Sequence, residues 1–146
     1  MKKLVYDIEC DGLNPTKIFC IVAIDTDTLQ EYKFRPGEID AGINLLKSAD
    51  CLIGHNIIGF DNLVVKKLHD VDLNDKKIYD TWIMSQVLNY RRPHKHGLAS
   101  WGIALGNRKI EFDDFENYSE EMLRYCVQDV RPVSYTHLTL PTKRIV

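Results

Sequence analysis

The stretch KLVYDIE, residues 3–9, alternates in character along the chain and predicts a β-strand with two different faces. One face is apolar and consists of Leu4, Tyr6 and Ile8. The other face carries Asp7 and Glu9, two positions apart, so both carboxylates point the same way. Two hard oxygen ligands in this arrangement suit Mg²⁺ or Mn²⁺. The stretch therefore predicts both the start of a sheet and a candidate metal site.

The acidic pair is a weak signal when taken alone, because the chain contains 21 acidic residues. A second triplet of the same form, Asp114-Phe115-Glu116, is interpreted as a solvated acidic loop. The first triplet differs in its setting: Asp7 and Glu9 follow an apolar run, where a purely structural strand would prefer neutral side chains.

Patterning further along the chain predicts the rest of the architecture. Strands at Phe19–Ile24 and Gln30–Phe34 extend the first strand into an antiparallel meander, and two shorter strands are expected at Cys51–Ile53 and Ile78-Tyr79. Helices are predicted at Asp40–Ser48, Leu63–Leu68, Thr81–Leu88 and Gly97–Leu105, and from Ser119 onward. Asp80 and Ser119 are the expected N-caps. This order predicts an α/β fold: a mixed sheet, the meander plus parallel strands, flanked by helices.

A second motif, GHNIIGFD at residues 54–61, follows a predicted strand and ends on Asp61. Asp61 has two interpretations. It is either a carboxylate of a functional site at the strand end or simply the cap of the helix Leu63–Leu68.

A third motif, YCVQD at residues 125–129, places Tyr125 and Asp129 one helical turn apart and hence on one face. The adjoining apolar stripe consists of Met122, Leu123, Cys126, Val127 and Val130. A Tyr alone would indicate core packing. A Tyr with an Asp one turn later favours a side chain pair at the edge of a cleft.

These three segments resemble the three sequence motifs of the DnaQ-like exonucleases, the DEDD superfamily, with Tyr125 typical of its DEDDy branch. Three longer stretches resemble the exonuclease domain of podovirus-type family A DNA polymerases: GHNIIGFDN, YDTWIMSQVL, and HGLASWGIALGNRKIEFDDF running toward YCVQD. The resemblance covers about residues 3–130.

The resemblance implies a ribonuclease H-like fold and a 3′–5′ exonuclease that hydrolyses phosphodiester bonds at DNA 3′ ends with two divalent ions, Mg²⁺ or Mn²⁺. Asp7 would bridge the two ions, Glu9 and Asp129 would complete one site, and Asp61 would hold the second ion. Tyr125 would orient the attacking water or help to remove its proton.

The resemblance also implies a route for the substrate strand between Leu13 and the loop that contains Asn56. Leu13 would wedge against the terminal base, Asn56 would bond the substrate backbone, and His55 and Phe60 are further candidates for substrate contact. Leu13 has the alternative of an ordinary loop hydrophobe, and His55 that of a hydrogen-bonded structural histidine.

The expected domain spans residues 1–131. Residues 132–146 are expected to be a non-native or disordered tail, since Pro132 interrupts the last helix; the alternative is a short native C-terminal arm. On this interpretation the domain is truncated, and it is a monomer whose partners are single-stranded DNA and a polymerase domain absent from the chain.

Composition indicates the cellular compartment but does not decide the function. The four cysteines lack CxxC spacing, which favours a reduced intracellular protein and argues against a zinc site formed by these thiols. We expect a cytoplasmic protein of a bacterial or phage-infected cell. The net charge of −2 is unusual for a nucleic-acid binder, although bound cations would offset it. The one dense basic cluster, residues 91–96, is either a phosphate contact or a solvated loop.

Two alternative functions remain open from the sequence. One is a stand-alone DEDDy nuclease that acts on RNA, similar to ribonuclease D. The other is a catalytically dead fragment that binds nucleic acid.

Overall fold

The computed structural model describes residues 1–88 and 116–131 of the chain. Four sequence predictions lie outside the described residues: the helix Gly97–Leu105, the basic cluster at 91–96, most of the second acidic triplet, and the tail after residue 131.

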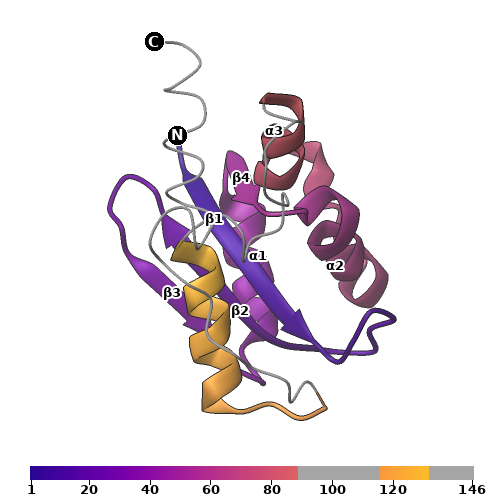
Figure 1. Cartoon of the computed structure of the whole chain (residues 1–146). Coiled ribbons are helices and arrows are strands. Elements are labelled where there is room, and N and C mark those ends of the chain that lie inside the picture. Colours follow the sequence, from indigo (N-terminus) through magenta and orange to yellow (C-terminus); the bar gives the residue numbers. More distant parts are fainter. Residues whose placement is uncertain (89–115, 132–146) are drawn as a thin grey trace.

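A five-stranded mixed sheet forms the centre of the fold (Figure 1). Its strands are β1 (Lys3–Cys10), β2 (Ile18–Asp25), β3 (Glu31–Phe34), β4 (Cys51–Gly54) and β5 (Lys77–Asp80). The spatial order is β3-β2-β1-β4-β5. The first three strands pair antiparallel, while β4 pairs parallel to β1 and β5 parallel to β4. The predicted fold class, a meander extended by parallel strands, is therefore confirmed.

The helices of the described ranges are α1 (Ile39–Ser48), α2 (Asn62–His69), α3 (Thr81–Leu88) and a helix over residues 120–131. Helix α1 leads from β3 to β4, and α2 forms the crossover between the parallel strands β4 and β5, while α3 and the 120–131 helix follow β5 along the chain. Two short helical segments had not been predicted: a π-helical segment η1 (Ile57–Asp61) and a 3₁₀ turn η2 (Leu73–Asp75). Segments of three and five residues are too short for apolar spacing to reveal them.

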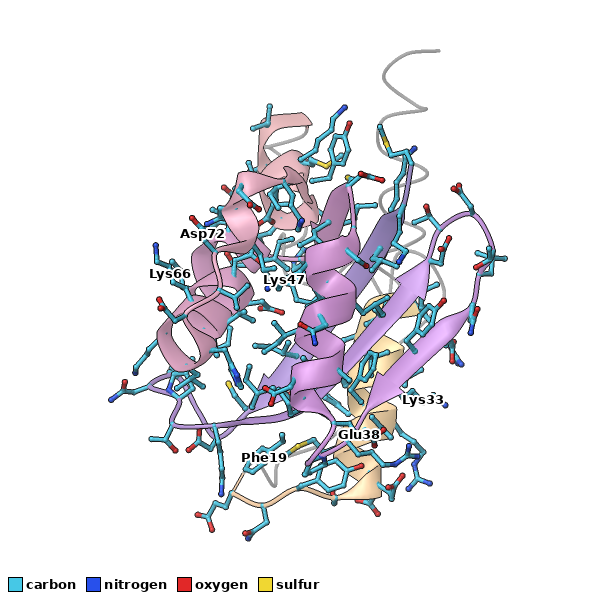
Figure 2. All side chains as sticks on the ribbon, turned by 180° about the vertical axis from the view of Figure 1, so that it is seen from behind. Phe19, Lys33, Glu38, Lys47, Lys66 and Asp72 are labelled. Atoms are coloured by element: carbon cyan, nitrogen blue, oxygen red, sulfur yellow. The ribbon has the colours of Figure 1, made fainter. Side chains whose placement is uncertain are left out.

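Two hydrophobic clusters cover the two faces of the sheet. The first joins Leu4, Tyr6 and Ile8 of β1 to the apolar residues of α1 and α2. The second joins Val5 and residues of β2 and β4 to Met122, Cys126 and Val130 of the 120–131 helix. In Figure 1 the 120–131 helix crosses in front of the strands, and in the reverse view of Figure 2 α1, which carries Lys47, lies in front of them. The alternation predicted for residues 3–9 thus separates the two faces as expected.

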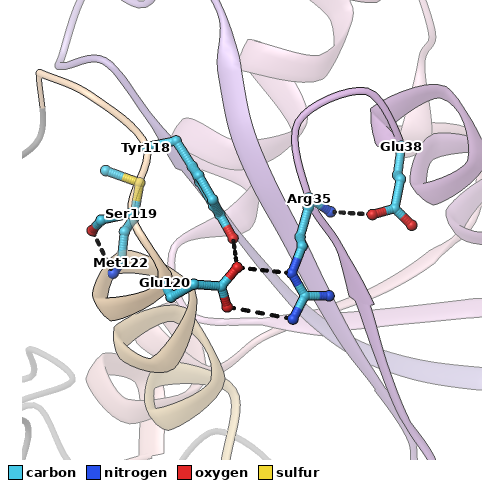
Figure 3. A network of polar contacts seen from close by, with 6 residues as sticks. All are labelled: Arg35, Glu38, Tyr118, Ser119, Glu120 and Met122. Carbon is cyan, nitrogen blue, oxygen red and sulfur yellow. Dashed lines mark hydrogen bonds and ion pairs between the residues drawn. The ribbon is translucent and has the colours of Figure 1, made fainter.

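The 120–131 helix, packed on the sheet through the second hydrophobic cluster, also has a cap and two exposed ion pairs to the β3 edge. Ser119 Oγ accepts the backbone N–H of Met122 at 3.1 Å, which confirms the predicted cap. Arg35 contacts Glu120 at 3.0 Å in the first turn (Figure 3), and Arg131 contacts Glu31 at 3.0 Å twelve residues after Ser119. Tyr118 also donates to Glu120 (Figure 3). The helix that carries Tyr125 is therefore attached along its length to one edge of the sheet.

Within the described ranges, 1–88 and 116–131, no helix has the length and apolar character needed to cross a membrane.

Candidate carboxylate site

The acidic pair of β1 lies where the pairing of that strand becomes irregular. Asp7 is opposite Val22 and Glu9 opposite Cys20 on β2, and the register shifts between Glu9 and Cys10. Such a bulge bends the strand and redirects the side chains near it. Asp7 is half-buried and Glu9 is buried. The two carboxylates thus face the second hydrophobic cluster, near the carboxyl end of the strand.

Asp61 reaches this pair from the end of η1. Its side chain is only 4% exposed, and its Oδ2 accepts the backbone N–H of Ile8 at 3.3 Å. Its carboxyl group also lies close enough to Asp7 for the charge of Asp7 to act on it. Burial, followed by the nearby charge of Asp7, raises the pKa of Asp61 well above its ordinary value. Three carboxyl groups, those of Asp7, Glu9 and Asp61, therefore converge at one place.

The geometry also decides between the two interpretations of Asp61. By position Asp61 is the N-cap of α2, but its side chain makes no capping hydrogen bond and its backbone is already helical. The capping interpretation is therefore wrong. The carboxylate is directed toward β1 instead.

Cys126 was not predicted as part of the site. Its sulfur lies 3.6 Å from Asp7 Oδ2, and ligand atoms of Asp7, Glu9 and Cys126 all lie within 4.8 Å of one another. Burial is the main cause that raises the pKa of the Cys126 thiol, so the neutral thiol is favoured there. A neutral thiol is a poor ligand for a hard cation, so Cys126 forms part of the wall of the site. The sequence did contain a sign of this position: Cys126 precedes Asp129 by three residues on a predicted helix, so both side chains lie on one face.

The 120–131 helix also carries the two residues of the third motif. Asp129 is buried, with 6% exposure, and lies one turn beyond Cys126, while Tyr125 is half-buried. Because Cys126 contacts Asp7, this helix packs directly on the strand that bears the acidic pair. The helix thus covers the face of the sheet on which Asp7 and Glu9 lie.

The predicted substrate residues lie in the loops around these acids. Leu13 is 93% exposed in the loop between β1 and β2. His55 and Asn56 follow β4, and Asn56 adopts the left-handed conformation with φ 59°. The ring nitrogen His55 Nδ1 lies 2.9 Å from Thr81 Oγ1, which agrees with a structural role. Phe60 is partly buried against the first hydrophobic cluster.

The donors present in the described residues fit a divalent cation. Carboxylate oxygens are the ligands that Mg²⁺ and Mn²⁺ prefer. Burial is the main cause of the raised pKa of Asp61, and repulsion by Asp7 and Glu9 adds to it; a cation placed among these carboxylates would relieve that repulsion. The cluster therefore offers the oxygen ligands that a divalent cation binds, and its negative charges would be stabilised by such a cation.

Comparisons with known proteins relate the chain to phage DNA polymerases. No family model matches the chain. The DNA-directed DNA polymerases of Enterobacteria phage T3 and Escherichia phage T7 are 28% and 26% identical over 87% of this chain. The chain spans about a quarter of the length of these curated relatives, 25% in each case.

Solved structures of low identity share the fold. Brucella melitensis NrnC bound to pGG matches with a TM-score of 0.73 and 20% identity, over 96% of this chain and 72% of that one. A structure of exonuclease I matches with a TM-score of 0.65 and 17% identity, over 92% of this chain and 39% of that one. The predicted resemblance is thus confirmed: the chain has a ribonuclease H-like fold, resembles the DnaQ-like 3′–5′ exonucleases, and is related in sequence to phage DNA polymerases.

Proposed function

We propose that the chain is a metal-dependent 3′–5′ exonuclease domain, residues 1–131, that hydrolyses phosphodiester bonds at DNA 3′ ends as the proofreading part of a phage-type polymerase. The observation that carries this proposal is the acidic cluster at β1, where ligand atoms of Asp7 and Glu9 lie within 4.8 Å of each other. The buried Asp61, hydrogen-bonded to the backbone of Ile8, is close enough for their charges to add to the rise in its pKa that burial causes. Buried acids repel one another unless a proton or a cation compensates them, and a site for nucleotide phosphates needs cations.

Asp7, Glu9, Asp61 and Asp129 are the proposed cation ligands. Two bound divalent ions would stabilise the negative charge that develops on the phosphate during an in-line displacement. The burial of Glu9, Asp61 and Asp129 keeps water away from their carboxylates, which strengthens each electrostatic interaction in the site.

The remaining groups would bind the strand and manage the proton of the attacking water. Tyr125, on the helix that covers β1, would hold that water or take part in removing its proton. Asn56 would bond the substrate backbone, Leu13 would pack against the terminal base, and His55 and Phe60 would line the loop beside them. The exposure of Leu13 leaves its apolar side chain available for that contact.

A second candidate is a nuclease that works on RNA without a polymerase domain. The relevant observation is the fold shared with NrnC bound to pGG, which matches with a TM-score of 0.73. The sequence relatives are DNA-directed DNA polymerases, and this supports DNA as the substrate.

The experiment uses the 146-residue chain and a single DNA strand labelled at its 5′ end. With Mg²⁺ or Mn²⁺ we expect a ladder of labelled products that shorten stepwise, and excess chelator should stop the reaction. A strand blocked at its 3′ end should survive. Immediate release of the label as a mononucleotide would instead indicate attack from the 5′ end and contradict the proposal.

The choice between substrates follows from the same assay with an RNA strand of identical sequence. Faster shortening of DNA supports the polymerase assignment. Faster shortening of RNA would favour the second candidate. Asp75→Asn is the control for the loss of one acidic side chain, because Asp75 is exposed and lies outside the carboxylate cluster. This variant should shorten both strands as fast as the wild type does.

A further inference from the structure

We propose that Asp80 is a positioning residue of the carboxylate site, and that its buried carboxylate holds the segment 54–61 so that Asp61 and Asn56 are correctly placed. This inference rests on the proposed function and deepens it, since Asp80 would act through other residues and would touch neither cation nor substrate.

The carboxylate of Asp80 accepts four backbone N–H groups while its side chain is only 3% exposed. Oδ1 accepts from Trp82 at 3.0 Å and Ile83 at 3.4 Å, which is ordinary capping of α3 and confirms that prediction. Oδ1 also accepts from Asn56 at 2.8 Å, and Oδ2 accepts from Ile58 at 3.0 Å. A cap requires only the first pair of bonds. The second pair comes from a different part of the chain.

The parallel pairing of β4 with β5 explains how one carboxylate reaches both segments. Gly54 and Asp80 are register partners at the carboxyl ends of these strands, so the segments that follow them begin side by side. Thr81 continues the attachment: its hydroxyl donates to the Gly54 carbonyl at 3.3 Å and contacts His55 Nδ1 at 2.9 Å. Asp80 and Thr81 together hold nearly every residue from Gly54 to Ile58.

The segment between this anchor and Asp61 is tightly packed. Asn56 is left-handed, and its carbonyl accepts the N–H of Phe60 at 3.1 Å. A Cβ at Gly59 would lie 2.6 Å from Asn56 Oδ1, so the two ends of the turn are in close contact. A displacement of Asn56 would therefore be passed on to Phe60 and to Asp61, the last residue of η1.

The far side of Asp61 is held independently. Asn62, 1% exposed, accepts a hydrogen bond from the hydroxyl of Tyr6 and donates to Asn74 Oδ1 at 2.7 Å. Loss of the Asp80 anchor should consequently shift the segment 54–61 while α2 stays in place. A positioning role for Asp80 predicts this local shift, whereas a residue that merely supports the fold would affect α2 as well.

The decisive variant is Asp80→Ser, because serine is as good an N-cap as aspartate but is too short to hold the second segment as well. We expect kcat to fall about tenfold to hundredfold, since a shift near 1 Å in a catalytic group has an effect of that size. KM for the strand should rise, because Asn56 moves too. The matched control is Asp72→Ser, in which an exposed aspartate that caps η2 through Asn74 alone is replaced. It should leave kcat and KM unchanged.

A measurement that needs no activity tests the same inference. In Asp80→Ser the amides of Asn56 and Ile58 should exchange their hydrogens about tenfold faster or more, while those of β1 and β2 keep their rates. The affinity for Mn²⁺, measured by calorimetry, should fall severalfold because Asp61 is displaced. Asp80→Asn keeps the shape of the side chain and one acceptor oxygen, so it should give smaller changes of the same kind. It replaces Asp80→Ser in these measurements if the serine variant is unfolded at the assay temperature.

Unchanged exchange at Asn56 and Ile58, or wild-type values of kcat and KM in Asp80→Ser, would overturn the positioning role. A wild-type chain that degrades no strand would contradict the proposed function instead. In that case wild-type Mn²⁺ affinity in Asp80→Ser would overturn the inference about Asp80, and a weakened affinity would support it.

Discussion

Two regions near the carboxyl ends of the parallel strands contain buried carboxylates, and they are stabilised in opposite ways. In the acid cluster, Asp7, Glu9 and Asp61 face one another, and burial together with neighbouring charge raises the pKa of Asp61. At the Asp80 anchor a single carboxylate accepts four backbone N–H groups. Both regions exclude water to a similar degree, with Asp61 4% and Asp80 3% exposed.

The difference shows which of the two regions has its buried charge compensated within the chain and which would need a bound cation. Hydrogen bonds from N–H groups compensate a buried charge within the fold, so the Asp80 anchor is complete as it stands. In the acid cluster Asp61 accepts one backbone N–H bond and is subject to the charges of Asp7 and Glu9, so a cation would compensate the cluster. Four predictions test this contrast.

The largest effect is expected from Asp7→Asn. Removing the carboxylate that would hold cations in the proposed mechanism should lower kcat by about 10³-fold or more, because bound cations would contribute several kcal/mol of charge stabilisation. Single-turnover rates over a wide range of Mn²⁺ concentrations give the measurement. Full recovery of the rate at high Mn²⁺ would show that Asp7 aids cation binding without acting in catalysis.

A smaller effect is expected from Tyr125→Phe, which keeps the ring and removes the hydroxyl. We expect kcat to fall about tenfold to hundredfold with little change in KM or cation affinity, because the hydroxyl would act on the attacking water alone. Rates measured between pH 6 and 9 test this role. A variant as fast as the wild type at each pH would remove Tyr125 from the mechanism.

The third prediction concerns stability in the presence of a chelator. A carboxyl group whose pKa is raised by folding destabilises the folded state as pH rises from its ordinary value of 3.8 through the raised value. Asp61→Asn should therefore melt at a higher temperature than the wild type near neutral pH, and this advantage should vanish as pH falls toward 3.8.

The same melting curves compare the two regions directly. Asp80→Asn should melt below the wild type near neutral pH and at low pH, because it loses hydrogen bonds instead of repulsion. Added Mg²⁺ should raise the melting temperature of the wild type and of Asp80→Asn, and should raise that of Asp61→Asn by less, because that variant lacks one ligand. Equal stabilisation of all three by Mg²⁺ would place the cation elsewhere.

The smallest effect is expected from Glu120→Gln on the exposed ion pair with Arg35. Hydrogen bonds from Arg35 and Tyr118 lower the pKa of Glu120, but exposed pairs are strongly screened by water. Any loss of stability should appear only above the lowered pKa and should vanish as pH falls through it. Glu121→Gln, on the exposed neighbour, is the control. A marked fall in kcat for Glu120→Gln alone would reveal that this pair places the 120–131 helix.

Local patterns in the sequence predicted much of the fold. Alternation along residues 3–9 correctly separated the two faces of β1, and apolar spacing located α1, α2 and α3 within a few residues. Strand alternation and helical spacing depend on residues that are close together in the chain, so they can be predicted from one sequence. The short segments η1 and η2 were missed because they contain too few residues to show a period.

The sequence by itself thus determined the strand that presents Asp7 and Glu9, the order of the elements, and the spacing of Tyr125 and Asp129. Only the tertiary structure decided that Asp61 meets Ile8 across 53 positions of chain, that Cys126 lies against Asp7, and that Asp80 holds Asn56. The physical reason is that a carboxylate looks the same in sequence whether it is satisfied by N–H groups or surrounded by other acids. Its environment is set by strand register and by the packing of distant segments.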